Sequence, residues 1–242
     1  MRIIDLYEVQ QPQGIPGREG IDIINGVELT GSTGYGHYPG KPYLSHLEDP
    51  TRLPAGLPRT VEYFKLTDTW VESLEGAPKI SNSSVLIRGN KSLQSLKGGP
   101  LFVQSGFYFA HQNDLRDLEG APAHIPETFT CHQNKNLSSL KGGPTSVGSD
   151  CKLNMNQSLT SLHGIGTKCF LSVRGELSIG KQVKSHALGL VLVNCKHFTL
   201  LFDGAEIIRH FIGKKTDRQR EDALIDCQHA LIDAGYDDLA QL

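Results

Sequence analysis

Histidine and cysteine side chains are the groups in this sequence that could hold a metal ion. Histidine occurs in two similar triplets, His111-Gln112-Asn113 and His132-Gln133-Asn134. Cys131, Cys151 and Cys169 could approach one another if neighbouring coils stack, and thiolates and imidazoles are zinc ligands. The triplets differ in phase by one residue and need not stack, however, and Cys131 and Cys151 occupy positions that carry Phe, Leu or Val in other copies of an internal repeat. We therefore expect histidines in solvated turns and small buried cysteines, with no metal site.

The motifs of three common catalytic classes are missing from the sequence. The glycine-rich segment 31–36 lacks the lysine of a phosphate-binding loop and has no clear helix behind it. Neither the Gly-x-Ser-x-Gly motif of hydrolases nor the HExxH motif of zinc proteases occurs. We expect no catalytic residues and no cofactor. An enzyme or toxin with its active site in residues 1–50 and the C-terminal segment stays open as an alternative.

A six-residue string, in most copies Ser-Leu-Lys/Glu-Gly-Gly/Ala-Pro, returns along the chain with a constant step of 22 residues. Its copies are residues 73–78, 95–100, 117–122 and 139–144, with a degenerate copy at 161–166. Self-similarity at this period is typical of solenoids, in which each repeat forms one coil. The apolar side chains of one coil contribute roughly 1.5–3 kcal/mol each, whereas ordering the backbone costs roughly 1–2 kcal/mol per residue. A coil therefore folds only against its neighbours.

Each repeat predicts a short strand followed by a turn with an amide side chain. Two apolar residues separated by one position share a face of a strand. These pairs are Val85/Ile87, Phe107/Phe109, Phe129/Cys131 and Cys151/Leu153. An amide side chain follows three residues later, where it can hydrogen-bond the backbone as the chain leaves the strand. It is Asn90, Gln112, Asn134 or Asn156 in successive repeats. Two leucines that point inward and a Gly/Pro corner then close the coil.

The skeleton apolar-x-apolar-x-x-Asn-x-x-Leu-x-x-Leu with a Gly/Pro corner resembles the leucine-rich repeat, in its short bacterial type with prolines on the outer arc. It differs by placing leucine three residues after the Asn rather than two. The resemblance covers about residues 52–180 and implies an α/β solenoid with a parallel β-sheet over residues 52–202. Further strands are expected at 61–66, 170–174 and 189–195.

Residues 203–242 are expected to form a helical cap, because the last coil of a solenoid would otherwise expose its apolar edge. The pattern predicts a short helix at 204–212 and a longer one that ends near Ala234. Thr216 or Asp217 can cap the start of the longer helix.

Residues 1–51 break the repeat and are expected to form the N-terminal cap, with strands at 1–9 and 27–30. The segment 31–43 is rich in Gly, Tyr and Pro and is interpreted as a surface loop of that cap. The alternative is a binding loop, since rigid tyrosines among glycines make good contact surface. Its contact residues would be Tyr35, His37, Tyr38 and Tyr43.

The terminal residues 231–242 are similar to the C-terminal tail of repeat proteins encoded by tailed bacteriophages, which also carry Leu-x-Gly-x-Pro repeats. That resemblance implies expression inside a bacterial host. The start of the chain lacks the apolar segment of a signal peptide, so we expect the five cysteines to be reduced thiols in a cytoplasm. The net charge of −2 predicts no broad attraction to nucleic acid or anionic membranes, and no run is long enough to span a bilayer.

The residues between the buried pairs point to the other face of the strands, which we expect to be the concave, partner-binding face. Its central row is Leu86, Tyr108, Thr130, Lys152 and Arg174, flanked by Arg88, Ala110, His132 and Asn154 on one side and by Ser84, Gly106, Thr128, Asp150 and Ser172 on the other. Tyr and Arg are common interface anchors. The expected contact residues are Leu86, Arg88, Tyr108, Thr130, His132, Lys152, Asn154 and Arg174.

These features predict a non-enzymatic recognition protein that binds a protein of the bacterial host and thereby blocks a defence or metabolic complex. The Gly/Tyr/Pro loop and the convex Lys-Gly-Gly-Pro ridge are alternative binding sites. A structural component of the virion is a further alternative function. The identity of the partner and the oligomeric state are left open.

Overall fold

The computed structural model describes residues 21–24, 27–30, 51–53, 55–164, 175–185, 188, 197–213 and 215–241. Several predicted features lie outside these described residues. They are the strands at 1–9, 170–174 and 189–195, the loop residues Tyr35, His37, Tyr38 and Tyr43, and the side chains of Cys169 and Arg174.

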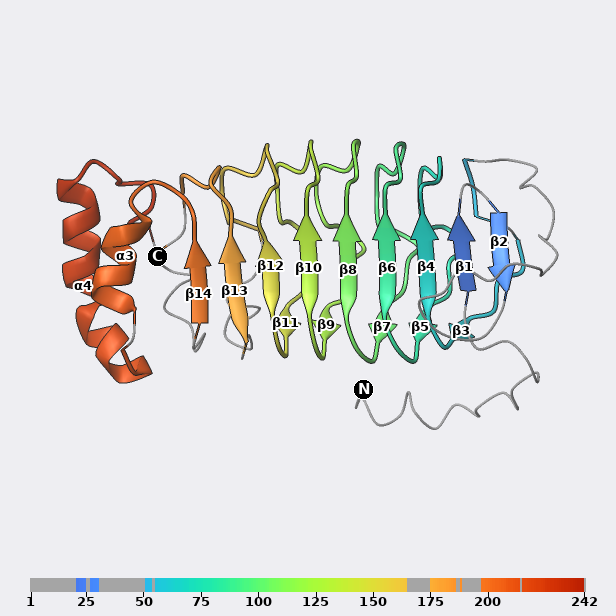
Figure 1. Ribbon diagram of the computed structural model, residues 1–242, viewed down its shortest axis with the longest axis horizontal. Coiled ribbons are helices and arrows are strands. Elements are labelled where there is room, and N and C mark those ends of the chain that lie inside the picture. Colours follow the sequence, from blue (N-terminus) through green and yellow to red (C-terminus); the bar gives the residue numbers. More distant parts are fainter. Residues whose placement is uncertain are drawn as a thin grey trace.

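In the described part of the chain, nine strands form one sheet that runs along the molecule (Figure 1). In spatial order they are β14 (His197–Leu200), β13 (Glu176–Ile179), β12 (Cys151–Leu153), β10 (Phe129–His132), β8 (Phe107–Ala110), β6 (Val85–Arg88), β4 (Phe64–Thr67), β1 (Ile21–Ile24) and β2 (Val27–Thr30). Neighbours from β14 to β1 pair in parallel, and β2 pairs antiparallel with β1. The chain is a parallel β-solenoid of about six turns, so the expected parallel stacking is confirmed.

The pairing register follows the 22-residue repeat through the middle of the sheet, where Phe107 pairs with Phe129 and Phe129 with Cys151. The step grows after β12, because Cys151 pairs with Leu177, 26 residues further along the chain. The predicted pairing of residues 170–174 with β12 was therefore wrong, because the strand beside β12 is β13. The coil between them is longer than the repeat, which moves every later strand out of the original phase.

A second, shorter strand precedes each main strand from β4 to β12. These strands are β3 (Thr60–Val61), β5 (Ile80–Ser81) and β7 (Phe102–Val103) in one small sheet, and β9 (His124–Ile125) and β11 (Ser146–Val147) in another. Val103, Ile125 and Val147 point inward and are buried. Phe102 points the other way, with 47% of its surface exposed.

The core lies between the main strands and the return path of each coil. Phe107, Phe109 and Phe129 are buried on one face of the sheet, and the rings of Phe107 and Phe129 stack with 6.3 Å between centroids. The two leucines of each repeat meet them from the opposite side. The buried leucines include Leu93, Leu96, Leu115, Leu118, Leu137 and Leu140. The inward orientation expected for both groups is confirmed.

An amide ladder connects the coils inside the core. Its members are Asn90, Gln112, Asn134 and Asn156, all of them buried. The Gln112 N–H donates to Asn134 Oδ1 at 3.1 Å, and the Asn134 N–H donates to Asn156 Oδ1 at 3.0 Å. Asn156 Nδ2 donates back to the Cys131 carbonyl at 2.9 Å. Each amide therefore satisfies backbone groups that the turn would otherwise bury without partners.

The Gly/Pro corners bring the outer arcs of neighbouring coils close together. Gly120 has a φ of +97°, a conformation that residues with a Cβ rarely adopt. A Cβ at this position would lie 2.5 Å from the backbone of Leu96 and Lys97 in the preceding coil. The glycine is thus required both by its own turn and by the spacing of the coils.

A charge ladder runs along the outer arc beside these corners. Glu119 contacts Lys97 at 2.8 Å and Lys141 at 2.6 Å, each from an adjacent coil. Hydrogen bonds from Lys141 and Lys97 lower the pKa of the Glu119 carboxyl from 4.5 to about 2. Both lysine side chains remain well exposed to solvent.

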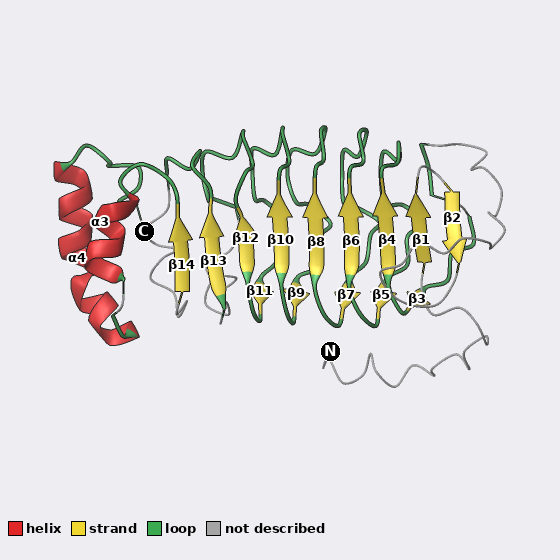
Figure 2. Ribbon diagram, viewed as in Figure 1, coloured by secondary structure: helices red, strands yellow, loops and turns green. Residues whose placement is uncertain are grey.

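Two helices follow β14 and lie at that end of the sheet (Figure 2). They are α3 (Ala205–Ile212) and α4 (Asp217–Asp233), as the sequence predicts. Thr216 caps α4, since its hydroxyl accepts the Gln219 N–H and the Gln219 side chain accepts the Thr216 N–H. Buried α3 and α4 residues such as Ile208 and Leu231 belong to the same apolar core as the strands. No helix in the described part of the chain is both long and apolar enough to cross a bilayer.

Candidate partner-binding face

The outward residues of the main strands form one continuous row. Strand pairing aligns Lys65, Leu86, Tyr108, Thr130, Lys152, Ser178 and Thr199 across seven strands. Leu86, Tyr108, Thr130 and Lys152 are half-buried in this row, which is the arrangement that the repeat predicts. The place predicted for Arg174 is taken by Ser178, because β13 follows the longer coil.

Tyr108 lies flat on this face rather than projecting from it. A Cβ added to Gly106 would lie 2.6 Å from Cε2 and 2.7 Å from the hydroxyl oxygen of Tyr108. The ring therefore covers Gly106, two residues earlier on the same side of the strand. The absence of a side chain at Gly106 sets the direction of the tyrosine.

A second row lies beside the first, toward the carboxyl ends of the strands. Arg88 pairs with Ala110 and Ala110 with His132, so these predicted residues are neighbours. Arg88 is exposed, His132 is half-buried, and Ala110 is buried between them. The small Ala110 leaves the two larger side chains to dominate this part of the face.

The two histidine triplets meet, contrary to the expectation from their difference in phase. The rings of His111 and His132 lie edge to face, with 5.9 Å between centroids. His111 follows β8 directly and has a φ of +58°, which turns the chain as soon as the strand ends. This left-handed turn brings the His111 ring back beside the last residue of β10. The one-residue offset is thereby compensated.

Positive charge gathers around His132. Burial lowers the pKa of the His132 imidazole, and the nearby His111, Arg88 and Lys152 lower it further. Positive charge on these three neighbours repels the proton that would charge the His132 ring. This part of the face is therefore rich in groups that favour an anionic contact.

An acidic residue that the sequence analysis missed lies at the other edge of the central row. Glu176 accepts hydrogen bonds from Ser178 at 3.1 Å and from Thr199 at 2.6 Å. Its own N–H donates to Asp150 Oδ1 at 2.8 Å. The alternation of Leu177 and Ile179 was the available signal for this strand, but it falls outside the 22-residue phase.

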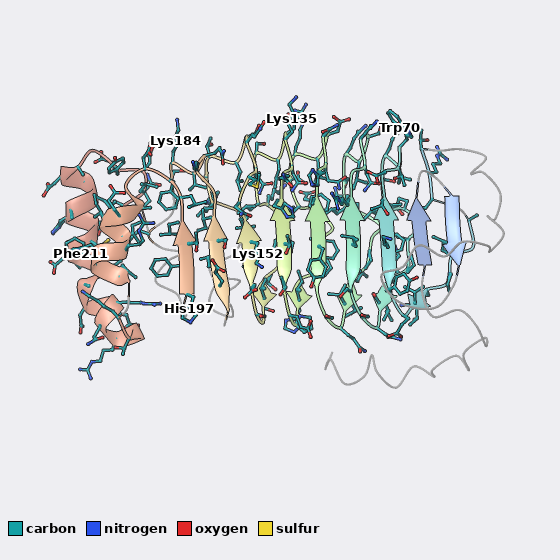
Figure 3. The ribbon with its side chains drawn as sticks, in the orientation of Figure 1. Trp70, Lys135, Lys152, Lys184, His197 and Phe211 are labelled. Atoms are coloured by element: carbon teal, nitrogen blue, oxygen red, sulfur yellow. The ribbon has the colours of Figure 1, made fainter. Side chains whose placement is uncertain are left out.

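A shallow groove of about 460 Å³ opens where the second row meets the turns beyond β10, β12 and β13. Its lining includes Asn154 from that row, the lysines Lys135 and Lys181, and the apolar side chains Met155 and Leu201. Met155 and Leu201 are 53% and 46% exposed. In Figure 3, Lys152 lies on the sheet and Lys135 on the turns beyond the strand ends. The sequence analysis assigned Asn154 to a partner site but did not anticipate the groove.

The cysteines of the described main strands lie away from this face. Cys131 and Cys151 are fully buried in the core, which confirms the prediction of small buried thiols, and burial raises the pKa of Cys131. Within the described residues, no group of three or more His, Cys, Asp or Glu side chains could hold a metal ion.

No family model, curated protein or solved structure matches the chain in the comparisons. The function of the face is therefore inferred from its own side chains and from the rigid sheet that carries them. The features that bear on it are the aligned row through Tyr108, the cluster around His132 and the adjoining groove.

Proposed function

We propose that the chain is a non-enzymatic binding module that docks a protein partner on the open face of its parallel sheet. The observation that carries the proposal is the unbroken row through Leu86, Tyr108, Thr130 and Lys152, bordered by Arg88. A tyrosine and an arginine beside a leucine form the kind of group that anchors protein interfaces. Because both edges of every central strand are paired, these side chains are held in place before a partner arrives, which reduces the entropy lost on binding.

The proposal includes the finer class of the fold. The amide ladder, the paired inward leucines and the Gly/Pro corners support a leucine-rich-repeat-like solenoid. Packing of α3 and α4 onto the core beside β14 supports a role as the C-terminal cap, since the last coil would otherwise expose its edge. We assign the corresponding N-terminal role to residues 1–51.

The proposed partner is a protein of a bacterial host, bound in the cytoplasm so as to block a defence or metabolic complex. Support comes from the resemblance of residues 231–242 to the tails of phage-encoded repeat proteins. Leu231 and Leu239 of this segment are buried in the core, and the Leu239 carbonyl accepts the Leu188 N–H at 3.0 Å. The segment is thus an integral part of the fold.

Affinity capture from a bacterial lysate tests the proposal. Tyr108→Ala/Thr130→Glu removes the anchor and adds a charge in the centre of the row, so the partner bound by wild type should be lost. Phe102→Ala/Thr145→Glu is the matched control, because it also replaces an aromatic residue by Ala and a threonine by Glu, at exposed positions on the short-strand side. Capture of the same partner by wild type and the Tyr108 variant, at equal yield, would exclude the open face as the binding site.

A further inference from the structure

Six basic groups lie on the open face and on the turns beyond the strand ends. We define the basic band as Arg88, His111, His132, Lys152, Lys135 and Lys181. Its first part is held by strand pairing, because Arg88, Ala110 and His132 are consecutive neighbours across β6, β8 and β10. The His111 ring lies 5.9 Å from that of His132. Lys152 follows on β12, in the adjacent row.

The groove extends the band beyond β12. Asn154 belongs both to the row of His132 and to the groove lining, so the two features are contiguous. Lys135 and Lys181 add positive charge there, and no Asp or Glu is among the described residues that line the groove. Neighbouring carboxylates in the described residues lie at the margins. They include Asp150, which contacts Lys152 at 3.6 Å, and Glu176, whose N–H donates to Asp150. Asp68 lies beside Gly89 at the start of the band.

The dimensions suit an extended peptide. Neighbouring strands are about 4.8 Å apart, so the band spans about 14 Å from β6 to β12 and about 19 Å to β13. An extended chain covers about 3.3 Å per residue. A segment of about six residues therefore reaches from Arg88 to Lys181.

We propose that this basic band receives a carboxylate-rich, extended segment of the protein partner, an inference that rests on the proposed function. Arg88 offers a planar pair of donors that matches a carboxylate, and the lysines add point charges along the path. Asn154 can pair with the backbone of the segment, and Met155 and Leu201 provide apolar contacts between the charges. The acidic net charge of the whole chain gives no general attraction to anions, so recognition is confined to this band.

Fluorescence anisotropy with labelled hexaglutamate tests the inference on the full chain. Arg88→Gln/Lys152→Gln should weaken binding at least tenfold at low ionic strength. Lys97→Gln/Lys141→Gln removes the same two charges from the outer arc and should leave binding unchanged. Hexaglutamine should not bind. Circular dichroism of each variant controls for folding, since Arg88 is exposed and the Lys152 side chain is 41% exposed.

The affinity for hexaglutamate should also rise as pH falls from 7.5 to 5.5. The pKa of His132 lies below its usual 6.5 because of burial and its basic neighbours, so the ring gains its charge at lower pH than an ordinary histidine does. A bound anionic ligand offsets the repulsion between His132 and its basic neighbours, so protonation of the ring strengthens binding. The glutamates of the peptide have an ordinary pKa of about 4.3 and stay ionised in this range. His132→Gln should flatten the pH dependence between these two values.

Three results would overturn the inference. The first is an equal loss of hexaglutamate affinity in Arg88→Gln/Lys152→Gln and in Lys97→Gln/Lys141→Gln. The second is undiminished affinity of Arg88→Gln/Lys152→Gln for hexaglutamate. The third is tighter binding of hexathymidylate than of hexaglutamate, which would indicate a nucleic-acid site.

Lysate capture separates this inference from the proposed function. Retention of the partner by Arg88→Gln/Lys152→Gln, with loss by Tyr108→Ala/Thr130→Glu, would reject the band and keep the face. Retention by both variants would reject both.

Discussion

The coils are connected by two ladders of polar side chains, one inside the core and one on the outer arc. In the amide ladder, Asn134 Oδ1 accepts the N–H of the preceding coil at 3.1 Å. In the charge ladder, Glu119 contacts Lys97 at 2.8 Å and Lys141 at 2.6 Å. The outer contacts are shorter and fully charged, yet water and salt compete for them. The inner groups have no alternative partner once they are buried.

The comparison indicates that burial, and not bond length, decides which ladder sets the register of the solenoid. A one-residue slip of a coil would move a buried backbone N–H away from its amide, and no water could replace it. The same slip would cost the outer lysines little, because long exposed side chains can follow a displaced carboxylate. The amide ladder should therefore dominate both stability and register.

The largest effect is expected from Asn134→Ala. This change leaves the buried Gln112 N–H without its acceptor and should lower the free energy of unfolding by about 1–3 kcal/mol. Urea denaturation measures the change. Asn136→Ala, two residues away and exposed, is the control and should unfold like wild type. Equal midpoints for the two variants would contradict the dominance of the inner ladder.

A smaller and opposite effect is expected from Gln112→Asn. Gln112 Oε1 is buried without a hydrogen-bond partner, whereas Oδ1 of Asn134 and of Asn156 accepts the N–H of the preceding coil. The shorter side chain should restore that pattern and raise the free energy of unfolding by about 1 kcal/mol. The same urea titration measures it. A loss of stability would show instead that the extra methylene of Gln112 is needed to fill the core.

The smallest effect is expected from Glu119→Gln on the outer arc, and it should depend on pH. The pKa of Glu119 is lowered to about 2 in the folded chain, so its contribution is present above the ordinary value of 4.5 and disappears as pH falls toward 2. The melting temperatures of wild type and variant should differ slightly at pH 7 and converge near pH 2. Added salt should also reduce the difference at pH 7. A difference at pH 7 as large as that caused by Asn134→Ala would reverse the ranking of the two ladders.

The parts of the fold that repeat could be predicted from the sequence. The constant step placed Phe107 and Phe129 in the core and gave Asn134 a hydrogen-bonding role at the strand exit, because equivalent positions in stacked coils have the same neighbours. Thr216 was predictable for a different reason, since capping depends on a few adjacent residues. Local and periodic signals therefore identified both the coils and the final helix.

The departures from the repeat were not predictable in the same way. The coil before β13 is longer than the 22-residue repeat, and no periodic residue marks the extra length. The contact between His111 and His132 was not predictable from the phase of their triplets, although a left-handed residue follows the strand in other coils too, as at Gln133 and Met155. Lys181 lines the groove from the turn after β13, which follows the longer coil. That part of the candidate site thus lies where the repeat is interrupted.

The outer arc also constrains how a chain of this kind can change in length. The position occupied by Glu119 carries Glu75, Lys97, Glu119 and Lys141 in consecutive coils, so the sign of the charge alternates with every copy. A duplication of one coil would place like charges side by side, whereas a duplication of two would preserve the alternation. Growth of the array by recombination should therefore proceed more readily in pairs of coils than in single ones.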